Sequence, residues 1–299
     1  MTTTIARVLL GGLLTACASK ALVDTAPTST PSQAAESSED IMTKTPKQLA
    51  ISAFNALFRD YSQDGVRAAF APDIIQHNIR VPTGRDALVG FVPILKDVGT
   101  TYDNHRLLQD GEFAVMHNTL DNAQPFGAAR MVSFNVYRTE GGQIVEHWGV
   151  PTPLVDTPAG APSQFDGATE VTDLDKTDAN KAAVVNLFEA VVSGEQDRVG
   201  AAVTGTFDPE YVNHSPGVGN GIPALFEAFG REQWVYTRNH KVLGEGNFVL
   251  AISEGTAKGV PSAFYDLLRF EDGKAVEHWD VIVAIPTEGL ANDNGMFGF

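Results

Sequence analysis

Residues 264–280 read FYDLLRFEDGKAVEHWD and have the pattern of a β-hairpin. Two runs rich in β-forming residues flank Asp272-Gly273, a dipeptide typical of a two-residue hairpin turn. Such a turn places Glu271 opposite Lys274. The stretch therefore predicts two adjacent antiparallel strands.

The hairpin also predicts which side chains share a face. Counting back from the turn places Tyr265 opposite Asp280, and side chains alternate between faces along a strand. We therefore expect Asp280, His278 and Tyr265 on one face. Asp266 and Trp279 fall on the other face, and both aspartates can enter one pocket only if a bulge shifts the register.

The end of this hairpin recurs earlier in the chain. Val145-Glu146-His147-Trp148 matches Val276-Glu277-His278-Trp279, 131 positions later. His77 and Gly84 match His214 and Gly221, each 137 positions later. Asn104-His105-Arg106 matches Asn239-His240-Lys241, and Gly111 matches Gly246, each 135 positions later. The slow drift is typical of changes in loop length, so the sequence predicts two tandem domains rather than short repeats.

Each copy has the same expected order of elements. Leu49, Ala53 and Leu57 lie three to four residues apart, as do apolar residues after Val184, and this spacing predicts a helix. Shorter helices are expected near 66–70 and 87–95, and near 198–203 and 224–229 in the second copy. Strands are expected at 112–120, 131–138, 143–150, 247–255, 263–270 and 275–283. Helices followed by an antiparallel meander indicate an α+β fold.

The N-terminal residues are typical of an exported protein. An apolar run at 8–14 follows Arg7 and is too short to span a bilayer. It ends in Leu14-Thr15-Ala16-Cys17, which resembles a lipoprotein signal cleaved before Cys17. That resemblance implies a bacterial envelope protein anchored to the membrane through lipid on Cys17, more consistent with the outer membrane because no aspartate follows. The alternative is a plain signal peptide with an incidental cysteine.

These features together predict six segments. Residues 18–43 are rich in Ser, Thr, Pro, Ala and Glu, which predicts a disordered tether. The expected segments are a signal peptide at 1–17, the tether at 18–43, a first domain at 44–156, a linker at 157–176, a second domain at 177–287 and a tail at 288–299.

Composition excludes several classes of function. Acidic residues outnumber basic ones by 37 to 21, and such a surface repels nucleic acid. No close His or Cys ligand spacing and no nucleotide-binding glycine motif is present, so no metal or cofactor is expected.

The hairpin and the stretch Tyr211-Val212-Asn213-His214-Ser215-Pro216 together resemble the SnoaL-like polyketide cyclases, which have the nuclear transport factor 2-like fold. The resemblance covers most of both copies. It implies curved antiparallel sheets wrapped round helices, with an apolar conical pocket. It also implies dimers packed through their sheets, so an intramolecular pseudo-dimer or a homodimer is expected.

The same resemblance implies an acid–base site in the second domain. Asp280 stands where these cyclases have the residue that acts in an intramolecular aldol condensation, and a carboxylate in an apolar pocket is a competent base near neutral pH. Asp266 and His214 are its candidate partners. Ligand-binding candidates are His278, Tyr265, Tyr211, His77 and His117.

The first copy lacks both carboxylates. Asn135 stands in place of Asp266 and Gly149 in place of Asp280, so we expect catalysis in the second domain only. His147-Trp148 recurs without the acids, which favours a structural role for the His-Trp pairs.

Three functions remain open from the sequence. The first is a cofactor-free acid–base enzyme acting on a small apolar carbonyl compound. The second is a non-catalytic envelope lipoprotein that binds a small apolar ligand or a partner protein. The third is a structural pair of domains without a functional pocket.

Overall fold

The computed structural model describes residues 44–299. The expected signal peptide, lipidation at Cys17 and tether fall on residues 1–43 and lie outside the described part. None of the helices in residues 44–299 has the length and apolar character needed to span a bilayer.

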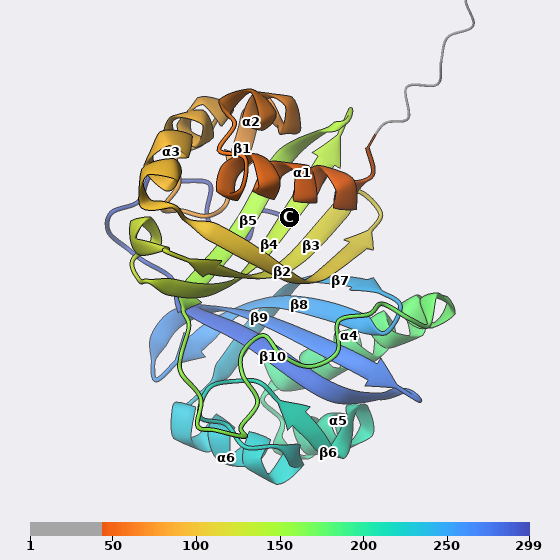
Figure 1. The fold of residues 1–299 in the computed structure, drawn as a ribbon. Coiled ribbons are helices and arrows are strands. Elements are labelled where there is room, and N and C mark those ends of the chain that lie inside the picture. Colours follow the sequence, from red (N-terminus) through yellow and green to blue (C-terminus); the bar gives the residue numbers. More distant parts are fainter. Residues whose placement is uncertain (1–43) are drawn as a thin grey trace, which may run out of the picture. The chain divides into compact units, whose positions relative to one another are not determined.

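The first unit spans residues 46–153 and consists of helices followed by a sheet (Figure 1). Its elements are α1 (Pro46–Phe58), α2 (Gln63–Ala69), β1 (Phe70–Gln76), α3 (Arg85–Val98), β2 (Thr101–Asp110), β3 (Phe113–Asp121), η1 (Gln124–Phe126), β4 (Arg130–Glu140) and β5 (Gln143–Pro153).

The second unit spans residues 174–284 and repeats this order. Its elements are η2 (Leu174–Lys176), α4 (Thr177–Ser193), α5 (Gln196–Thr206), β6 (Phe207–Asn213), α6 (Gly221–Glu232), β7 (Val235–Glu245), β8 (Phe248–Ala257), β9 (Val260–Glu271) and β10 (Lys274–Ala284).

The two sheets have the same topology. Each has five strands, in the orders β1-β5-β4-β3-β2 and β6-β10-β9-β8-β7. In each, the first strand runs parallel to the last one, and the other neighbours are antiparallel. The α+β class with two repeated units is therefore confirmed.

Local sequence explains where key elements begin and turn. Helix α1 starts at a capping box, in which the Thr45 side chain accepts from the Gln48 backbone while the Gln48 side chain accepts from the Thr45 backbone. The β9–β10 turn has positive φ at both Asp272 and Gly273, which matches a type I′ hairpin. The hairpin expected from the sequence is confirmed.

Two strands of each unit escaped the sequence prediction. β1 and β6 carry the motifs around His77 and His214, and they are short, with exposed Asp and Glu positions. β2 and β7 carry the Asn-His pairs, and many of their residues are only partly buried. Neither pair shows the apolar alternation that marks a strand.

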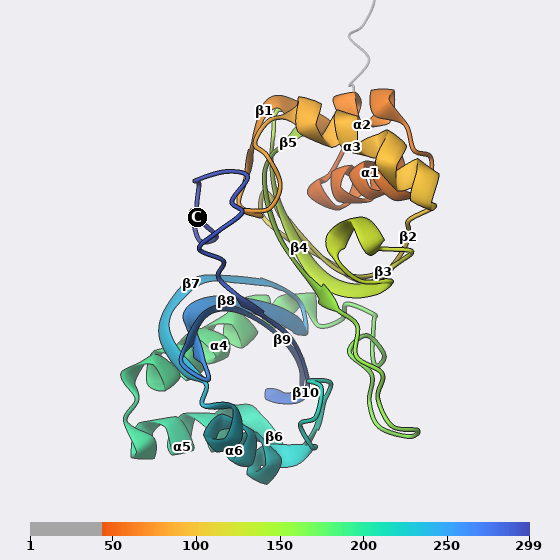
Figure 2. The same cartoon turned by 90° about the vertical axis from the view of Figure 1, so that its left-hand side faces the viewer.

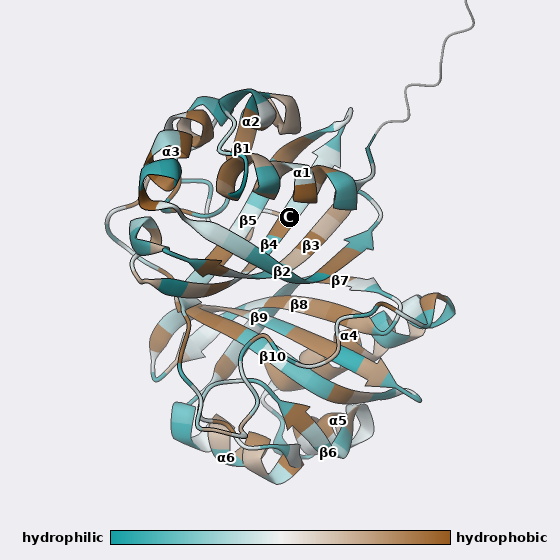
Figure 3. Ribbon diagram, viewed as in Figure 1, coloured by the Kyte–Doolittle hydropathy of each residue, from teal (hydrophilic) through white to brown (hydrophobic). Residues whose placement is uncertain are grey.

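Each sheet has two distinct faces. The cavity face curves round the helices of its own unit (Figure 2). The contact face packs against the other sheet, where Phe134 and Trp148 of the first unit share a core with Tyr265 and Trp279 of the second. Both hydrophobic and polar residues occur along β9 and β10 (Figure 3). The two units therefore contact each other through their sheets.

Two irregular segments complete the contact. In the segment before the second unit, the Asp166 carbonyl accepts from Trp279 Nε1 at 2.9 Å and from Arg106 Nη2 at 2.5 Å. In the C-terminal tail, Phe299 stacks on Trp148 with ring centroids 4.4 Å apart. Each segment thus covers the tryptophan of one unit.

Candidate functional site

A β-bulge brings the two aspartates of the second unit together. The register of β9 and β10 shifts between Ala275 and Glu277, so Asp280 pairs with Asp266 and His278 with Leu268. The expected pairing of Asp280 with Tyr265 is wrong, because the unbulged count omits the extra residue. Asp280, Asp266 and His278 consequently share the cavity face.

Tyr265 takes the opposite side of the hairpin. It is 1% exposed and packs in the core shared by the two sheets, with Phe134 at a centroid distance of 6.4 Å. The same bulge that aligns the aspartates turns Tyr265 towards the contact face, away from the ligand position expected for it.

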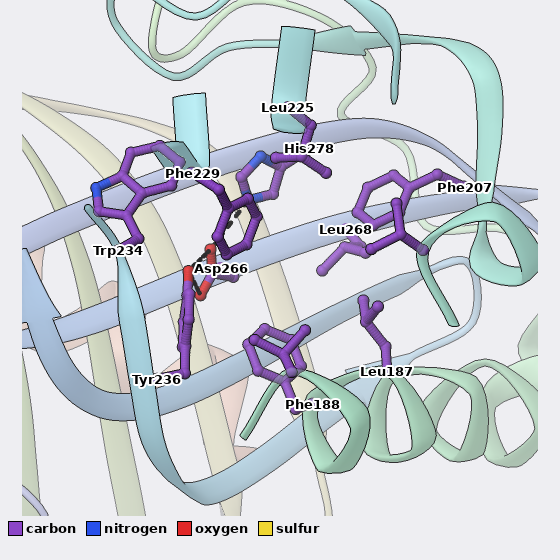
Figure 4. A pocket seen from close by; sticks show the side chains of 12 residues that line it. Leu187, Phe188, Phe207, Leu225, Phe229, Trp234, Tyr236, Asp266, Leu268 and His278 are labelled. Carbon is purple, nitrogen blue, oxygen red and sulfur yellow. Dashed lines mark hydrogen bonds and ion pairs between the residues drawn. The ribbon is translucent and has the colours of Figure 1, made fainter. Parts of the chain in front are cut away.

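Asp266, His278 and Asp280 are buried close together, and each has a hydrogen-bond partner within the protein. His278 Nε2 lies 3.1 Å from Asp266 Oδ1, and Tyr236 OH lies 3.4 Å from the same carboxylate (Figure 4). Ser215 Oγ donates to Asp280 Oδ2 at 2.7 Å. All three groups are at most 6% exposed, so their charges are poorly solvated.

Burial and neighbouring charge set the protonation of this cluster. Burial raises the pKa of Asp280 to about 6; the charge of His278 and the Ser215 hydrogen bond lower that pKa, while the charge of Asp266 raises it. Burial alone lowers the pKa of His278, but its hydrogen bond to Asp266 and the charges of Asp266 and Asp280 outweigh burial, so this pKa is raised. Asp266 and protonated His278 form an ion pair, beside the Asp280 carboxyl group whose pKa is about 6.

The same donors have the types that divalent metals accept. One ligand atom from each of Asp266, His278 and Asp280 lies within 4.8 Å of the others. Each of these groups also has a partner within the protein, through the His278–Asp266 pair and the Ser215 hydrogen bond to Asp280.

The cavity beside this cluster is small. It holds about 40 Å³, enough for a few water molecules, and Asp266 and His278 lie on its wall. Aromatic side chains fill the rest of the space (Figure 4); they are Phe188, Phe207, Phe229, Trp234 and Tyr236.

The first unit has a much larger cavity at the corresponding place. It measures about 700 Å³ and lies between α1, α3, η1 and the cavity face of β4 and β5. One wall is the segment 122–129, which joins β3 to β4 and includes η1; the corresponding connection in the second unit is only Lys258-Gly259. The drift of the repeat from 135 to 131 positions was the sequence signal for this insertion.

Neutral polar groups form the floor of this larger cavity. His147 Nε2 lies 3.0 Å from Asn135 Oδ1, and Asn135 Nδ2 donates to Ser133 Oγ at 3.0 Å. Burial, with a contribution from the charge of His77, lowers the pKa of His147 to about 3, so the imidazole is neutral. This floor can hydrogen-bond a ligand but provides no base near neutral pH.

Gly149 is required by the position of His147. A Cβ at residue 149 would lie 2.8 Å from His147 Nε2 and 3.0 Å from Asn135 Oδ1. The aspartate found at this place in the second unit therefore does not fit here unless His147 moves.

His77 and His214 lie on the contact faces rather than in the cavities. Each stacks on the tryptophan of its unit at a centroid distance of 4.6 Å. His77 Nδ1 lies 2.9 Å from the Gly295 carbonyl oxygen, and His214 Nδ1 lies 2.8 Å from the Ser163 carbonyl oxygen. The sequence predicted His214 as a catalytic group and His77 as a ligand-binding group. Their side chains instead lie on the contact faces, stacked on Trp148 and Trp279.

His117 and Tyr211 are also enclosed by protein. His117 Nδ1 lies 3.1 Å from Arg106 Nη1, and its ring stacks on Phe134 between the sheets. Tyr211 OH accepts a hydrogen bond from Asn213 Nδ2 at 3.2 Å, and Tyr211 is 1% exposed. Neither residue is part of the wall of its unit's cavity.

Two residues from beyond the first unit line the large cavity and were not predicted from the sequence. Val283 at the end of β10 and Met296 in the C-terminal tail both line it. Nothing local to these positions marks them, because their role depends on the contact between the units.

Solved structures similar to part of this chain include the following three. They are TsrD from Streptomyces laurentii (16% identity, 35% of this chain and 85% of that one, TM-score 0.31), a putative ketosteroid isomerase from Kribbella flavida (19%, 41% and 93%, 0.33) and an epoxide hydrolase of M. tuberculosis described as LEH-like (16%, 36% and 82%, 0.30). No curated protein matches the chain. Residues 51–147, which run from α1 into β5, match the family model of the SnoaL-like domain.

Proposed function

We propose that this protein binds a small apolar molecule in the cavity of its first unit. The observation that carries the proposal is the cavity of about 700 Å³, which lies within the usual range for ligand sites. Its wall is mostly aliphatic and aromatic, as expected for a site that gains affinity from apolar burial. The segment that matches the SnoaL-like domain includes the helices and most of the strands that enclose it.

The floor of the cavity favours a neutral polar group on the ligand. Asn135, Ser133 and His147 offer donors and acceptors without charge at neutral pH. A ligand carbonyl or hydroxyl can join this network without burying a charge. Binding without chemistry is the simplest consequence, because no carboxylate is among the residues that line this cavity.

The experiment fills the cavity and measures binding of an uncharged fluorescent dye such as Nile red. Ala87 lies on α3 and lines the cavity, so Ala87→Trp should abolish the blue-shifted emission of the bound dye. Ala224 is the matching position on α6 and is similarly half-buried, so Ala224→Trp is the control and should bind normally. Equal binding by wild type and both variants would overturn the proposal.

A second candidate function rests on the buried cluster of the second unit. The carboxylate of Asp280 would take a proton from the carbon next to a carbonyl group of a small substrate. The C–H bond breaks, an O–H bond forms on Asp280, and the electron pair moves to the carbonyl oxygen, which protonated His278 or Tyr236 would stabilise. The pKa of about 6 at Asp280 supports this candidate. Asp266 and His278 line the small cavity but Asp280 does not, so the surrounding side chains must move before a substrate can reach Asp280.

This candidate is tested by deuterium exchange into cyclohexanone, followed by NMR in D2O. Exchange should rise as Asp280 ionises through about pH 6, and Asp280→Asn should reduce it to background. Ser215→Ala removes a hydrogen bond that lowers the pKa of Asp280, so it should move the midpoint to higher pH. Wild-type exchange equal to that of Asp280→Asn would exclude the candidate.

For location, we propose an envelope lipoprotein anchored through Cys17. The support is the short apolar run followed by Leu14-Thr15-Ala16-Cys17. Metabolic labelling with a fatty acid in a bacterial host should modify the wild type but not Cys17→Ser. Equal labelling of both proteins would contradict this proposal.

A further inference from the structure

The large cavity has one charged residue in its wall. Of its lining residues within the described chain, only Arg80 carries a charge at neutral pH. His147 and Tyr137 also line the cavity but are neutral, because burial lowers the pKa of His147 and raises the pKa of Tyr137. This is notable in a chain with a formal charge of −16, where acidic groups outnumber basic ones. The charge of this wall is therefore opposite to that of the protein.

The Arg80 guanidinium is available to a ligand. Its backbone N–H donates to Asn78 Oδ1 at 3.1 Å, whereas across residues 44–299 its side chain has no hydrogen bond or ion pair with protein. The residue is exposed and lies beside the apolar residues Ile79, Val81 and Pro82, which also line the cavity. A free guanidinium at the margin of an apolar cavity is suited to bind a planar anion.

The segment that carries Arg80 is held in place by the C-terminal tail. Asn292 Nδ2 donates to the carbonyls of Asn78 and Val81 at 3.0 and 2.8 Å, and Ala291 N donates to the Ile79 carbonyl at 2.8 Å. The backbone on both sides of Arg80 is thereby fixed. The cation is thus presented from an ordered position, which reduces the entropy cost of binding.

We propose that the ligand of this cavity is an anionic amphiphile with a carboxylate head, its apolar body inside the cavity and its carboxylate paired with Arg80. The inference deepens the proposed binding function and rests on it. The neutral floor disfavours a buried charge, so the anion belongs at the solvent-accessible margin, where Arg80 lies. A fatty acid has this chemistry.

The test compares three ligands with the same chain and different heads: dodecanoate, dodecanol and dodecyltrimethylammonium, each displacing Nile red at pH 8. Dodecanoate should bind most tightly and the ammonium compound most weakly. Arg80→Gln should weaken dodecanoate about three- to tenfold, the range for a solvent-accessible bidentate ion pair, and leave dodecanol within about twofold. Lys96→Gln, on the exposed side of α3, makes the same charge change and should alter neither.

The outcomes separate the two proposals. If none of the ligands displaces the dye and the dye itself does not bind, the proposed binding function fails. If dodecanol binds as well as dodecanoate and Arg80→Gln changes neither, binding stands and the carboxylate assignment is wrong. Tighter binding of the ammonium compound would also overturn the assignment. Circular dichroism and Tm of Arg80→Gln should match the wild type, since its side chain makes no hydrogen bond or ion pair within residues 44–299.

Discussion

Asp280 lies directly opposite Asp266 across β10 and β9, at a position where two carboxyl groups share one buried space. In the first unit the corresponding pair is Asn135 opposite Gly149. The two units have therefore diverged in opposite directions. The unit with the carboxylates has aromatic side chains in its cavity, and the unit with the open cavity has no carboxylate on its floor.

We predict that Asp280→Asn makes stability less dependent on pH. The pKa of Asp280 is raised from 3.8 to about 6 in the folded protein. The protonated carboxyl group therefore contributes to the free energy of unfolding; this contribution is fully present below about pH 4 and is lost as pH rises through 6. Asparagine resembles the protonated form and avoids this loss, which is about 3 kcal/mol at most. The variant should unfold at a higher temperature than the wild type at pH 8, measured by calorimetry.

Asp266→Asn is the matched comparison and should have the opposite effect. It removes the ion-pair partner of buried His278 while leaving the side chain the same size. Breaking a buried pair on one side costs roughly 3 kcal/mol, so this variant should be less stable than wild type at pH 5. If both variants shift stability in the same direction at all pH values, the assigned protonation states are incorrect.

The sequence predicted the pair of carboxylates but not their common face. The two runs of β-forming residues and the Asp272-Gly273 turn predicted the hairpin correctly, because turn geometry is local. The bulge between Ala275 and Glu277 has no comparable local signal, and one extra residue exchanges the faces of all residues beyond it. That single shift explains why Tyr265 was expected beside Asp280 and lies on the opposite side.

The histidines show a second limit of sequence reasoning. The repetition of His77 and His214 indicated that these residues matter, but it did not distinguish a role in the site from a structural role. Their Nδ1 atoms lie beside the carbonyl oxygens of Gly295 and Ser163, which belong to irregular segments far away in the chain. Contacts of this type depend on how the units pack, and no periodicity encodes them.

We predict that binding of an uncharged dye in the first unit is independent of pH between 5 and 8. The pKa of His147 is lowered to about 3 and that of Tyr137 is raised, so neither changes charge in this interval. Dissociation constants from a fluorescence titration at four pH values should agree within about twofold. A transition near pH 6 would instead indicate binding beside Asp280, and Asp280→Asn would remove it.

Gly149→Ala should destabilise the floor of the large cavity. The new methyl group would lie 2.8 Å from the His147 ring, so His147 must move away from Asn135. Overpacking of this kind costs about 1–3 kcal/mol, and dye affinity should fall with it. Gly90→Ala is the control: this residue lines the same cavity on α3, a methyl group added there would meet no atom within 4 Å, and alanine favours helix. Urea unfolding of both variants distinguishes local crowding from a general effect of removing glycine.

The C-terminal tail should contribute to ligand affinity as well as to stability. Met296 is 7% exposed and lines the cavity of the first unit although it follows the last strand of the second. Met296→Ala removes apolar contacts from the cavity wall and should lower stability by about 2 kcal/mol and weaken dye binding. Leu290→Ala changes a tail residue that is 48% exposed and should have an effect below about 0.5 kcal/mol. Unchanged affinity in Met296→Ala, with the expected loss of stability, would mean that the tail holds the units together without forming part of the binding site.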